Sequence, residues 1–181
     1  HRGILAAGDR PSEPDLDSLL KASSSLAILE DLSNHDNVGG IFRCTAALAG
    51  IPLAPLLQGP AILLSPRCCD PLYRKAIRVS VGTALRVPFA RLAPWPDRLQ
   101  DVRRAGFALL ALTPDSAAIP IDRLGLPANL RPALLLGAEG PGLTPPALAS
   151  ADVRVRIPIS AGVDSLNVVT GFVHRLVGRH V

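Results

Sequence analysis

The sequence predicts an α/β fold in which a mostly parallel sheet is covered by helices on both faces. Short apolar segments alternate with amphipathic ones along the chain, which is the pattern of strands and helices in such folds. The 18 prolines lie mainly between these segments, where they end one element before the next begins. The 181 residues are 48% hydrophobic, which is enough to fill the core of one domain.

The first predicted unit is a strand, a loop and a helix. The strand covers Leu26–Glu30, the loop passes through Asn34 and His35, and the helix runs from about Asn37 to Ala49. Gly50 follows at the position where a left-handed helix cap is expected. The apolar face of this helix consists of Val38, Ile41, Phe42, Thr45, Leu48 and Ala49.

The same alternation continues to the end of the chain. Further strands are predicted at residues 61–64, 86–89, 107–112, 133–136 and 153–157. Further helices are predicted at residues 71–79, 97–105, 145–149 and 165–179. Because helices separate nearly all the strands, successive strands are expected to run parallel.

Composition narrows the classes of function. No apolar run reaches the roughly 18 residues of a membrane-spanning helix, and the N-terminus lacks a signal-peptide pattern, so we expect a soluble, cytoplasmic protein. The spacing of Cys44, Cys68 and Cys69 fits neither a disulfide framework nor a metal site. Of the 19 basic residues 17 are arginine, a side chain suited to phosphate and bases, and this bias is compatible with an RNA partner.

Three segments far apart in the chain place glycine and polar residues beside apolar strands. They are NVGGIFR at Asn37–Arg43, LLLGAEGPGLT at Leu134–Thr144 and IPISAGVDSLNVV at Ile157–Val169. The second is not a phosphate-binding P-loop, because it lacks the required lysine, and its glycine spacing does not fit a dinucleotide fingerprint. Ligands of parallel α/β sheets bind where strands end, so we expect these segments to form one site.

Together, in this order, the three segments resemble the motifs of the SpoU family of RNA 2'-O-ribose methyltransferases, within the SPOUT superfamily. The resemblance implies a C-terminal trefoil knot and S-adenosylmethionine-dependent methylation of a ribose 2'-hydroxyl in structured rRNA or tRNA. It also implies an entry segment at residues 1–25 and a catalytic domain at residues 26–181. Family members commonly carry a small N-terminal RNA-binding domain, which we expect upstream of His1.

The resemblance assigns four residues to cofactor binding. Gly137, Ile157 and Leu166 are implied to contact S-adenosylmethionine largely through backbone groups, and Leu112 is a further candidate at the end of an earlier strand. An apolar rim with backbone donors and acceptors suits an adenine ring and a sulfonium. No metal is needed, because the cofactor already supplies a good leaving group.

Arg43 matches the catalytic arginine of the family, and two roles remain open for it. The family proposal makes it a base whose pKa is lowered by its surroundings. Because guanidinium stays protonated in proteins, we favour a clamp that binds the adjacent phosphate and stabilises the developing alkoxide.

Four polar residues complete the implied catalytic set. Asn37 is expected to cap its helix and to face the active cleft, since asparagine is favoured at helix N-caps. By analogy with the family, Ser165 and Asn167 orient the nucleotide and hold Arg43. Glu139 is expected to bond with loop amides or with Asn37, and a general-base role is the less favoured alternative for it.

The family also implies a homodimer that pairs through the C-terminal helix. Its apolar residues Phe172, Val173, Leu176 and Val177 exceed what one buried face requires. Two alternatives remain open, namely an inactive RNA- or nucleotide-binding module of the same fold and a flavodoxin-like nucleotide binder. A serine hydrolase is disfavoured, because Ser165 lacks the surroundings of a nucleophile elbow.

Overall fold

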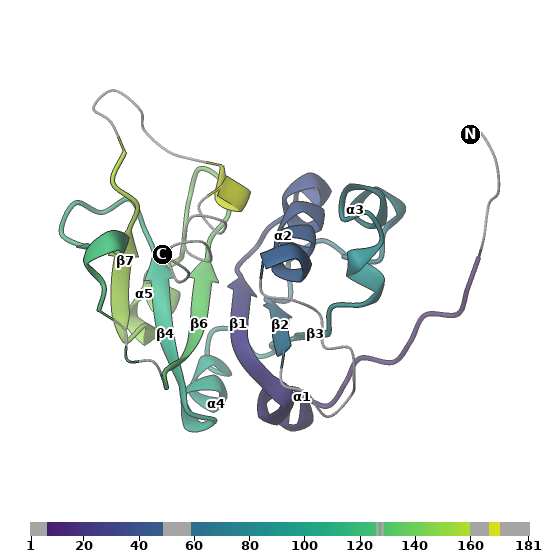
Figure 1. Cartoon of the computed structure of the whole chain (residues 1–181), viewed down its shortest axis with the longest axis horizontal. Helices are drawn as coiled ribbons and strands as arrows, with labels where there is room; N and C mark the ends of the chain where they lie inside the picture. The colour runs from purple at the N-terminus through teal and green to yellow at the C-terminus, as the bar shows by residue number, and fades with distance from the viewer. Residues whose placement is uncertain (1–6, 49–58, 126, 128, 160–166, 171–181) are drawn as a thin grey trace.

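The computed structural model describes residues 7–48, 59–125, 127, 129–159 and 167–170 (Figure 1). In these residues seven strands form one sheet in the order β3-β2-β1-β6-β4-β7-β5, and every pairing between neighbours is parallel. The strands are β1 Ser23–Leu29, β2 Gly59–Leu64, β3 Phe89–Arg91, β4 Phe107–Leu112, β5 Ile119–Pro120, β6 Arg131–Leu136 and β7 Val153–Arg156. The predicted parallel α/β sheet is therefore confirmed.

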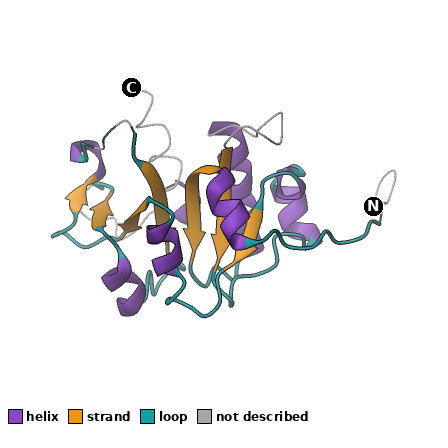
Figure 2. Ribbon diagram, turned by 90° about the horizontal axis from the view of Figure 1, so that it is seen from below, coloured by secondary structure: helices purple, strands orange, loops and turns teal. Residues whose placement is uncertain are grey.

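Helices cover both faces of this sheet, as predicted (Figure 2). On one face, Ala27 and Leu29 of β1 belong to a buried cluster with Ile41 and Phe42 of helix α2. On the other face, Leu26 and Ile28 belong to a second cluster with residues of helices α1 and α4. Alternate residues of a strand point to opposite faces, so one apolar strand supplies both cores. The helices are α1 Leu16–Ala22, α2 His35–Leu48, α3 Arg74–Val79, α4 Leu99–Arg104 and α5 Pro145–Ser150.

Adjacent glycines let α2 approach two neighbours closely. A Cβ at Gly39 would lie 2.7 Å from the carbonyl oxygen of Ala76 in α3. A Cβ at Gly40 would lie 2.9 Å from a methyl group of Val169 near the end of the chain. The two glycines of the NVGG motif therefore place α2 between α3 and the C-terminal segment, since any larger residue would force these elements apart.

The direction in which the sheet grows reverses beside β1. From β1 the chain adds β2 and then β3 on one side, whereas β6, β4, β7 and β5 lie on the other side. Because all strands are parallel, their carboxyl ends lie at one edge of the sheet. Ligands of open α/β sheets bind at this edge, near the point where the strand order reverses.

Most predicted elements lie where the sequence places them, and the differences have local causes. The strand predicted at residues 86–89 is instead Phe89–Arg91, because the amides of Arg86 and Val87 both donate to the Thr83 carbonyl, and the ladder with β2 begins only where Ile62 donates to the Pro88 carbonyl. Helix α1 lies within the segment predicted as an entry linker; its N-cap Asp15 accepts from Ser18, and Leu19 and Leu20 are buried. The division into two segments at residue 25 itself stays a prediction.

The end of the chain is described only in part. The helix predicted from Ser165 begins later, because Asn167 is not helical and the described helical residues are 168–170. The positions of Gly50, Ser165, Leu166 and the predicted knot lie outside the described residues, so the knot stays a prediction. Within the described part of the chain, no helix has the length and apolar character needed to cross a bilayer.

Candidate functional site

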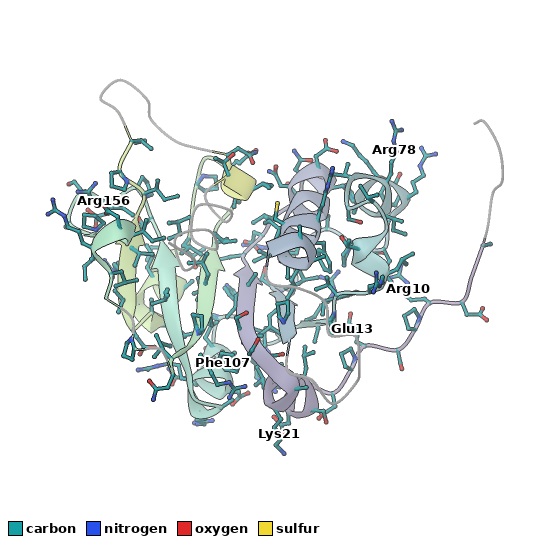
Figure 3. The ribbon with its side chains drawn as sticks, in the orientation of Figure 1. Arg10, Glu13, Lys21, Arg78, Phe107 and Arg156 are labelled. Atoms are coloured by element: carbon teal, nitrogen blue, oxygen red, sulfur yellow. The ribbon has the colours of Figure 1, made fainter. Side chains whose placement is uncertain are left out.

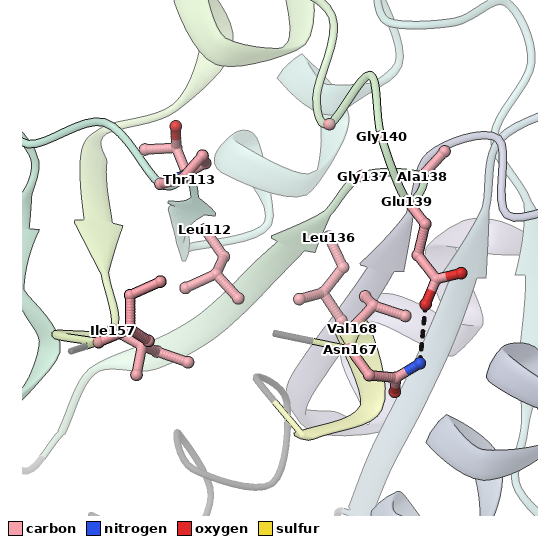
Figure 4. A pocket seen from close by; sticks show the side chains of 13 residues that line it. Leu112, Thr113, Leu136, Gly137, Ala138, Glu139, Gly140, Ile157, Asn167 and Val168 are labelled. Atoms are coloured by element: carbon pink, nitrogen blue, oxygen red, sulfur yellow. Dashed lines mark hydrogen bonds between the residues drawn. The ribbon is translucent and has the colours of Figure 1, made fainter. Parts of the chain in front are cut away.

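A cavity of about 330 Å³ lies at the carboxyl edge of β4, β6 and β7 (Figure 4). Three strand ends and the C-terminal segment contribute to it, although they are far apart in the sequence. Its lining consists of residues 112–114, 136–140, Gly142, Ile157, Ile159, Asn167 and Val168. This is the edge at which the fold predicts a ligand site.

Three of the four residues expected to bind a cofactor line this cavity. Leu112 is the last residue of β4, Gly137 follows β6 directly, and Ile157 follows β7. Leu166, the fourth, lies outside the described residues. The parallel register of neighbouring strands thus brings Leu112, Gly137 and Ile157 together, whereas their assignment as cofactor contacts stays a prediction.

The loop after β6 turns back tightly on itself. The amide of Gly142 donates to the carbonyl of Ala138 over 2.9 Å, and these two residues also form an antiparallel bridge. A Cβ at Gly137 would overlap backbone atoms of Gly142 and Leu143. Only glycine fits at position 137, and the loop can therefore present backbone groups directly to the cavity.

A network of three polar side chains joins the three sequence motifs. Asn167 Nδ2 donates to Asn37 Oδ1 over 3.0 Å and to Glu139 Oε1 over 2.7 Å (Figure 4 draws the contact with Glu139). Asn167 Oδ1 accepts from the amide of Val169 over 2.9 Å, where the last described helical turn begins. The side-chain amide of Asn167 thus links α2, the loop after β6 (residues 137–143, called the glycine loop below) and the C-terminal segment. Glu139 reaches Asn37 only through Asn167 and not by the direct bond that was one of the two options predicted for it.

Asn37 corrects one prediction. Helix α2 begins at His35, so Asn37 lies inside the helix and does not cap it. Asn34 takes the capping position, since its side chain accepts from the amide of Asp36 over 2.9 Å. Asn37 is instead 6% exposed and contacts Asn167, which agrees with the second expectation, that it faces the site.

Arg43 does not line the cavity. Its side chain is exposed on α2, about one and two-thirds turns beyond Asn37. Its guanidinium can therefore reach a substrate in solvent. Among the described residues that line the cavity, Glu139 is the only one with a charged side chain. Ser165 lies outside the described residues, so its position relative to Arg43 and Asn167 stays a prediction.

Glu30 is a positioning residue that the sequence interpretation missed. Its side chain is 1% exposed and lies directly after β1. Oε1 accepts from Trp95 Nε1 and from Thr144 Oγ1, each over 2.6 Å, and Oε2 accepts from the Thr144 amide over 2.8 Å. Glu30 therefore fixes the far end of the glycine loop to the strand beside it. The available signal was a carboxylate at the end of an apolar strand, which is costly to bury unless it is bonded.

The comparisons with known proteins agree with this geometry. A protein of Mycobacterium tuberculosis, named an uncharacterized tRNA/rRNA methyltransferase, is 46% identical over 171 residues, which are 94% of this chain and 56% of the relative. The 23S rRNA (guanosine-2'-O-)-methyltransferase of Acinetobacter baylyi is 31% identical over 93% of this chain and 66% of its own length.

Among solved structures, an AdoMet-bound rRNA methyltransferase from Sinorhizobium meliloti is similar in fold. Its TM-score is 0.77 at 23% identity, and the similarity covers 95% of this chain and 62% of that one. The chain thus spans between about half and two thirds of the length of these relatives. A sequence profile of the SpoU rRNA Methylase family matches residues 24–172. The chain therefore belongs to the SpoU rRNA Methylase family.

Proposed function

We propose that the chain transfers a methyl group from S-adenosylmethionine to a ribose 2'-hydroxyl of structured RNA, either rRNA or tRNA. The observation that carries the proposal is the contact of Asn167 with Asn37 and Glu139, because it unites all three motifs beside the cavity. The Acinetobacter baylyi relative, whose name specifies guanosine 2'-O-methylation of 23S rRNA, supports the choice of acceptor atom.

The cavity fits S-adenosylmethionine in shape and in charge. Leu112, Leu136 and Ile157 provide an apolar wall, and Gly137 exposes backbone groups beside it. Glu139 supplies negative charge, and among the described lining residues no cation opposes a sulfonium. Bound there, the cofactor would supply an activated methyl group. The S. meliloti neighbour, described as AdoMet bound, supports the same assignment.

The chain's own groups then position the acceptor. Asn167 lines the cavity, and its bonds to the buried Asn37 and to Glu139 fix its orientation there. We assign Arg43 to the phosphate beside the acceptor ribose, where a permanent positive charge stabilises the developing alkoxide. Ser165 and Leu166 complete the proposed set, the first at the nucleotide and the second at the cofactor.

We further propose a homodimer that pairs through the C-terminal helix. Phe172, Val173, Leu176 and Val177 give this segment more apolar surface than one buried face requires. Arg43 is exposed on a separate helix, so pairing through the C-terminal segment leaves it available to RNA.

The test is incubation of the chain with methyl-labelled S-adenosylmethionine and total cellular RNA, followed by alkaline hydrolysis. Label in alkali-resistant dinucleotides is expected, because a 2'-O-methyl group blocks cleavage of the adjacent phosphodiester. Arg43→Ala should abolish the label and leave cofactor affinity within a few-fold, whereas Arg104→Ala, an exposed arginine on α4, should retain it. Label in a methylated base would contradict the proposal, and cofactor binding without any label would favour the inactive module.

A further inference from the structure

The net positive charge of the chain is concentrated in one segment. Residues 71–96 contain five basic side chains and no aspartate or glutamate, in a chain whose formal net charge is +4. This segment contains α3, the turn at residues 80–82, the short 3-10 helix Thr83–Leu85 and β3. We call six of its exposed side chains the α3 surface: Tyr73, Arg74, Arg78, Val81, Leu85 and Arg86. Lys75 is also exposed but is paired with Asp36 of α2.

The three arginines of the α3 surface have no carboxylate counterion, a property that the exposed Arg43, Arg123 and Arg154 share with them among the described residues. Among the described residues, no ion pair joins Arg74, Arg78 or Arg86 to a carboxylate. Outside this segment, five described arginines are paired with carboxylates, in the pairs Arg10–Asp70, Arg67–Asp31, Arg98–Asp101, Arg103–Asp152 and Arg104–Asp101. Uncompensated guanidinium groups gathered within 13 residues of chain are typical of a polyanion site.

The packing of α3 directs these arginines outward. Ala76 and Val79 face α2, where they contact the position of Gly39. Arg74 and Arg78 are four residues apart on the opposite side of α3, so their side chains lie next to each other. Figure 3 shows Arg78 pointing away from the body of the molecule. Two forked donors at this spacing can bind neighbouring phosphates.

Exposed apolar side chains lie beside these arginines. Val81 is 69% exposed, Leu85 is 63% exposed and Tyr73 is 45% exposed. Val81 has φ +54°, a left-handed conformation that a β-branched residue rarely adopts. The turn therefore holds a valine in solvent at a cost in strain of about 1–2 kcal/mol, which is more common at binding sites than elsewhere.

The α3 surface is continuous with the proposed active site through α2. Gly39 brings α3 against one side of α2, and Gly40 brings Val169, next to the catalytic network, against another side. Arg43 lies one turn after Gly39, on the same side of α2 as the α3 contact. A strand of RNA with its acceptor ribose near Arg43 can therefore extend over α3.

We propose that the α3 surface binds the phosphate backbone and unstacked bases of the RNA next to the modified nucleotide. Arg74, Arg78 and Arg86 contact phosphates, and Val81, Leu85 and Tyr73 contact sugars and base faces, which is the combination used to bind single-stranded loops. The choice of RNA as polyanion rests on the proposed function. The surface does not depend on the knot or on the C-terminal helix.

The test compares two triple variants that lose the same charge. One is Arg74→Gln/Arg78→Gln/Arg86→Gln. The control is Arg98→Gln/Arg103→Gln/Arg104→Gln, at the N-cap and in the last turn of α4, where all three arginines are paired with carboxylates. Binding of a structured rRNA fragment is measured as a function of salt. The α3 variant should weaken binding about tenfold or more and lower the slope of log K against log salt by about 2–3, whereas the control should change binding less than threefold.

The readout separates this inference from the proposed function. A wild-type chain that binds RNA but transfers no methyl refutes the function and leaves the comparison of the two variants valid. Equal weakening by both variants, or no RNA binding by the wild type, overturns the inference. It is also overturned if the α3 variant changes the association state and not RNA affinity, because the surface would then bind protein. S-adenosylmethionine affinity should be unchanged in both variants, since none of the six side chains lines the cavity. Thermal unfolding should be unchanged in the α3 variant, whereas the control loses three ion pairs and should be slightly less stable.

Discussion

At the scale of single residues, the site depends on the orientation of one amide. Asn167 uses its nitrogen for Asn37 and Glu139 and its oxygen for the Val169 amide. The ionised Glu139 can only accept and the Val169 amide can only donate, so these two partners fix which end of the Asn167 amide faces which way, and Asn37 then presents its Oδ1. Position 167 therefore requires a side chain with both a donor and an acceptor.

Replacing Asn167 with aspartate separates these two uses. Asn167→Asp keeps the acceptor for Val169 but places an oxygen against Asn37 Oδ1 and a second negative charge beside Glu139. We expect methyl transfer to fall about 100-fold, the size of effect that a small displacement of a site can cause. Steady-state rates of transfer measure this. Asn34→Asp, the same change at the α2 cap, is the control, and an equal loss there would contradict the role of the network.

Glu30 provides a second prediction at this scale. Glu30→Gln places an NH₂ group against donors from Thr144 or Trp95, and an unsatisfied buried donor costs about 1–3 kcal/mol. Denaturant unfolding should show a loss of this size, together with weaker cofactor binding, because the glycine loop loses its anchor. Glu13→Gln, at an exposed carboxylate, should change neither quantity. Cofactor affinity equal to wild type in Glu30→Gln would show that the anchor has no influence on the site.

At the scale of elements, the glycine loop is the part most sensitive to a single methyl group. Gly137→Ala would push the backbone of residues 142 and 143 away, which should weaken S-adenosylmethionine binding at least tenfold. Gly106→Ala is the matched control: Gly106 has φ +87°, so alanine there costs about 1–2 kcal/mol in strain, but it is outside the cavity lining. Isothermal titration measures both. Similar affinity losses in the two variants would mean that general destabilisation, and not the loop, is responsible.

The sequence predicts elements well where their signal is apolar and continuous. β4, the strand Phe107–Leu112, lies at the predicted residues because its run of apolar residues is bounded by a glycine on one side and a proline nearby on the other. Helix α1 was missed because it spans only seven residues and its apolar character is limited to one short face. The start of α2 was placed two residues late, because Asn34 and Asn37 are both plausible caps and only the fold selects between them.

The sequence predicted which residues belong to the candidate site, but it did not predict the hydrogen bonds between them. The three motifs identified Gly137, Glu139 and Asn167, and the structure brings them to one cavity. Glu30 carries no motif of its own, because its role depends on Trp95 and Thr144, which come from distant parts of the chain. Long-range pairing of this kind leaves no periodic trace in a single sequence.

At the scale of the whole molecule, the expected assembly is a homodimer. Light scattering at micromolar concentration should give twice the mass of the chain. Val173→Asp/Leu176→Asp should shift it to the monomer, because charges on the proposed interface oppose its burial. Leu85→Asp, at an exposed leucine on the α3 surface, should leave the dimer intact. A wild-type monomer at this concentration, or dissociation caused by Leu85→Asp, would contradict pairing through the C-terminal helix.

The proposed function requires that the cavity at the carboxyl edge of β4, β6 and β7 binds the methyl donor. The most direct measurement is a crystal structure of the chain with bound S-adenosylhomocysteine. The predicted complex has the adenosine against Leu112, Gly137 and Ile157, with the sulfur directed toward the group formed by Asn37, Glu139 and Asn167. Ligand bound at another place, or a cavity that stays empty at saturating ligand, would contradict this account of the site.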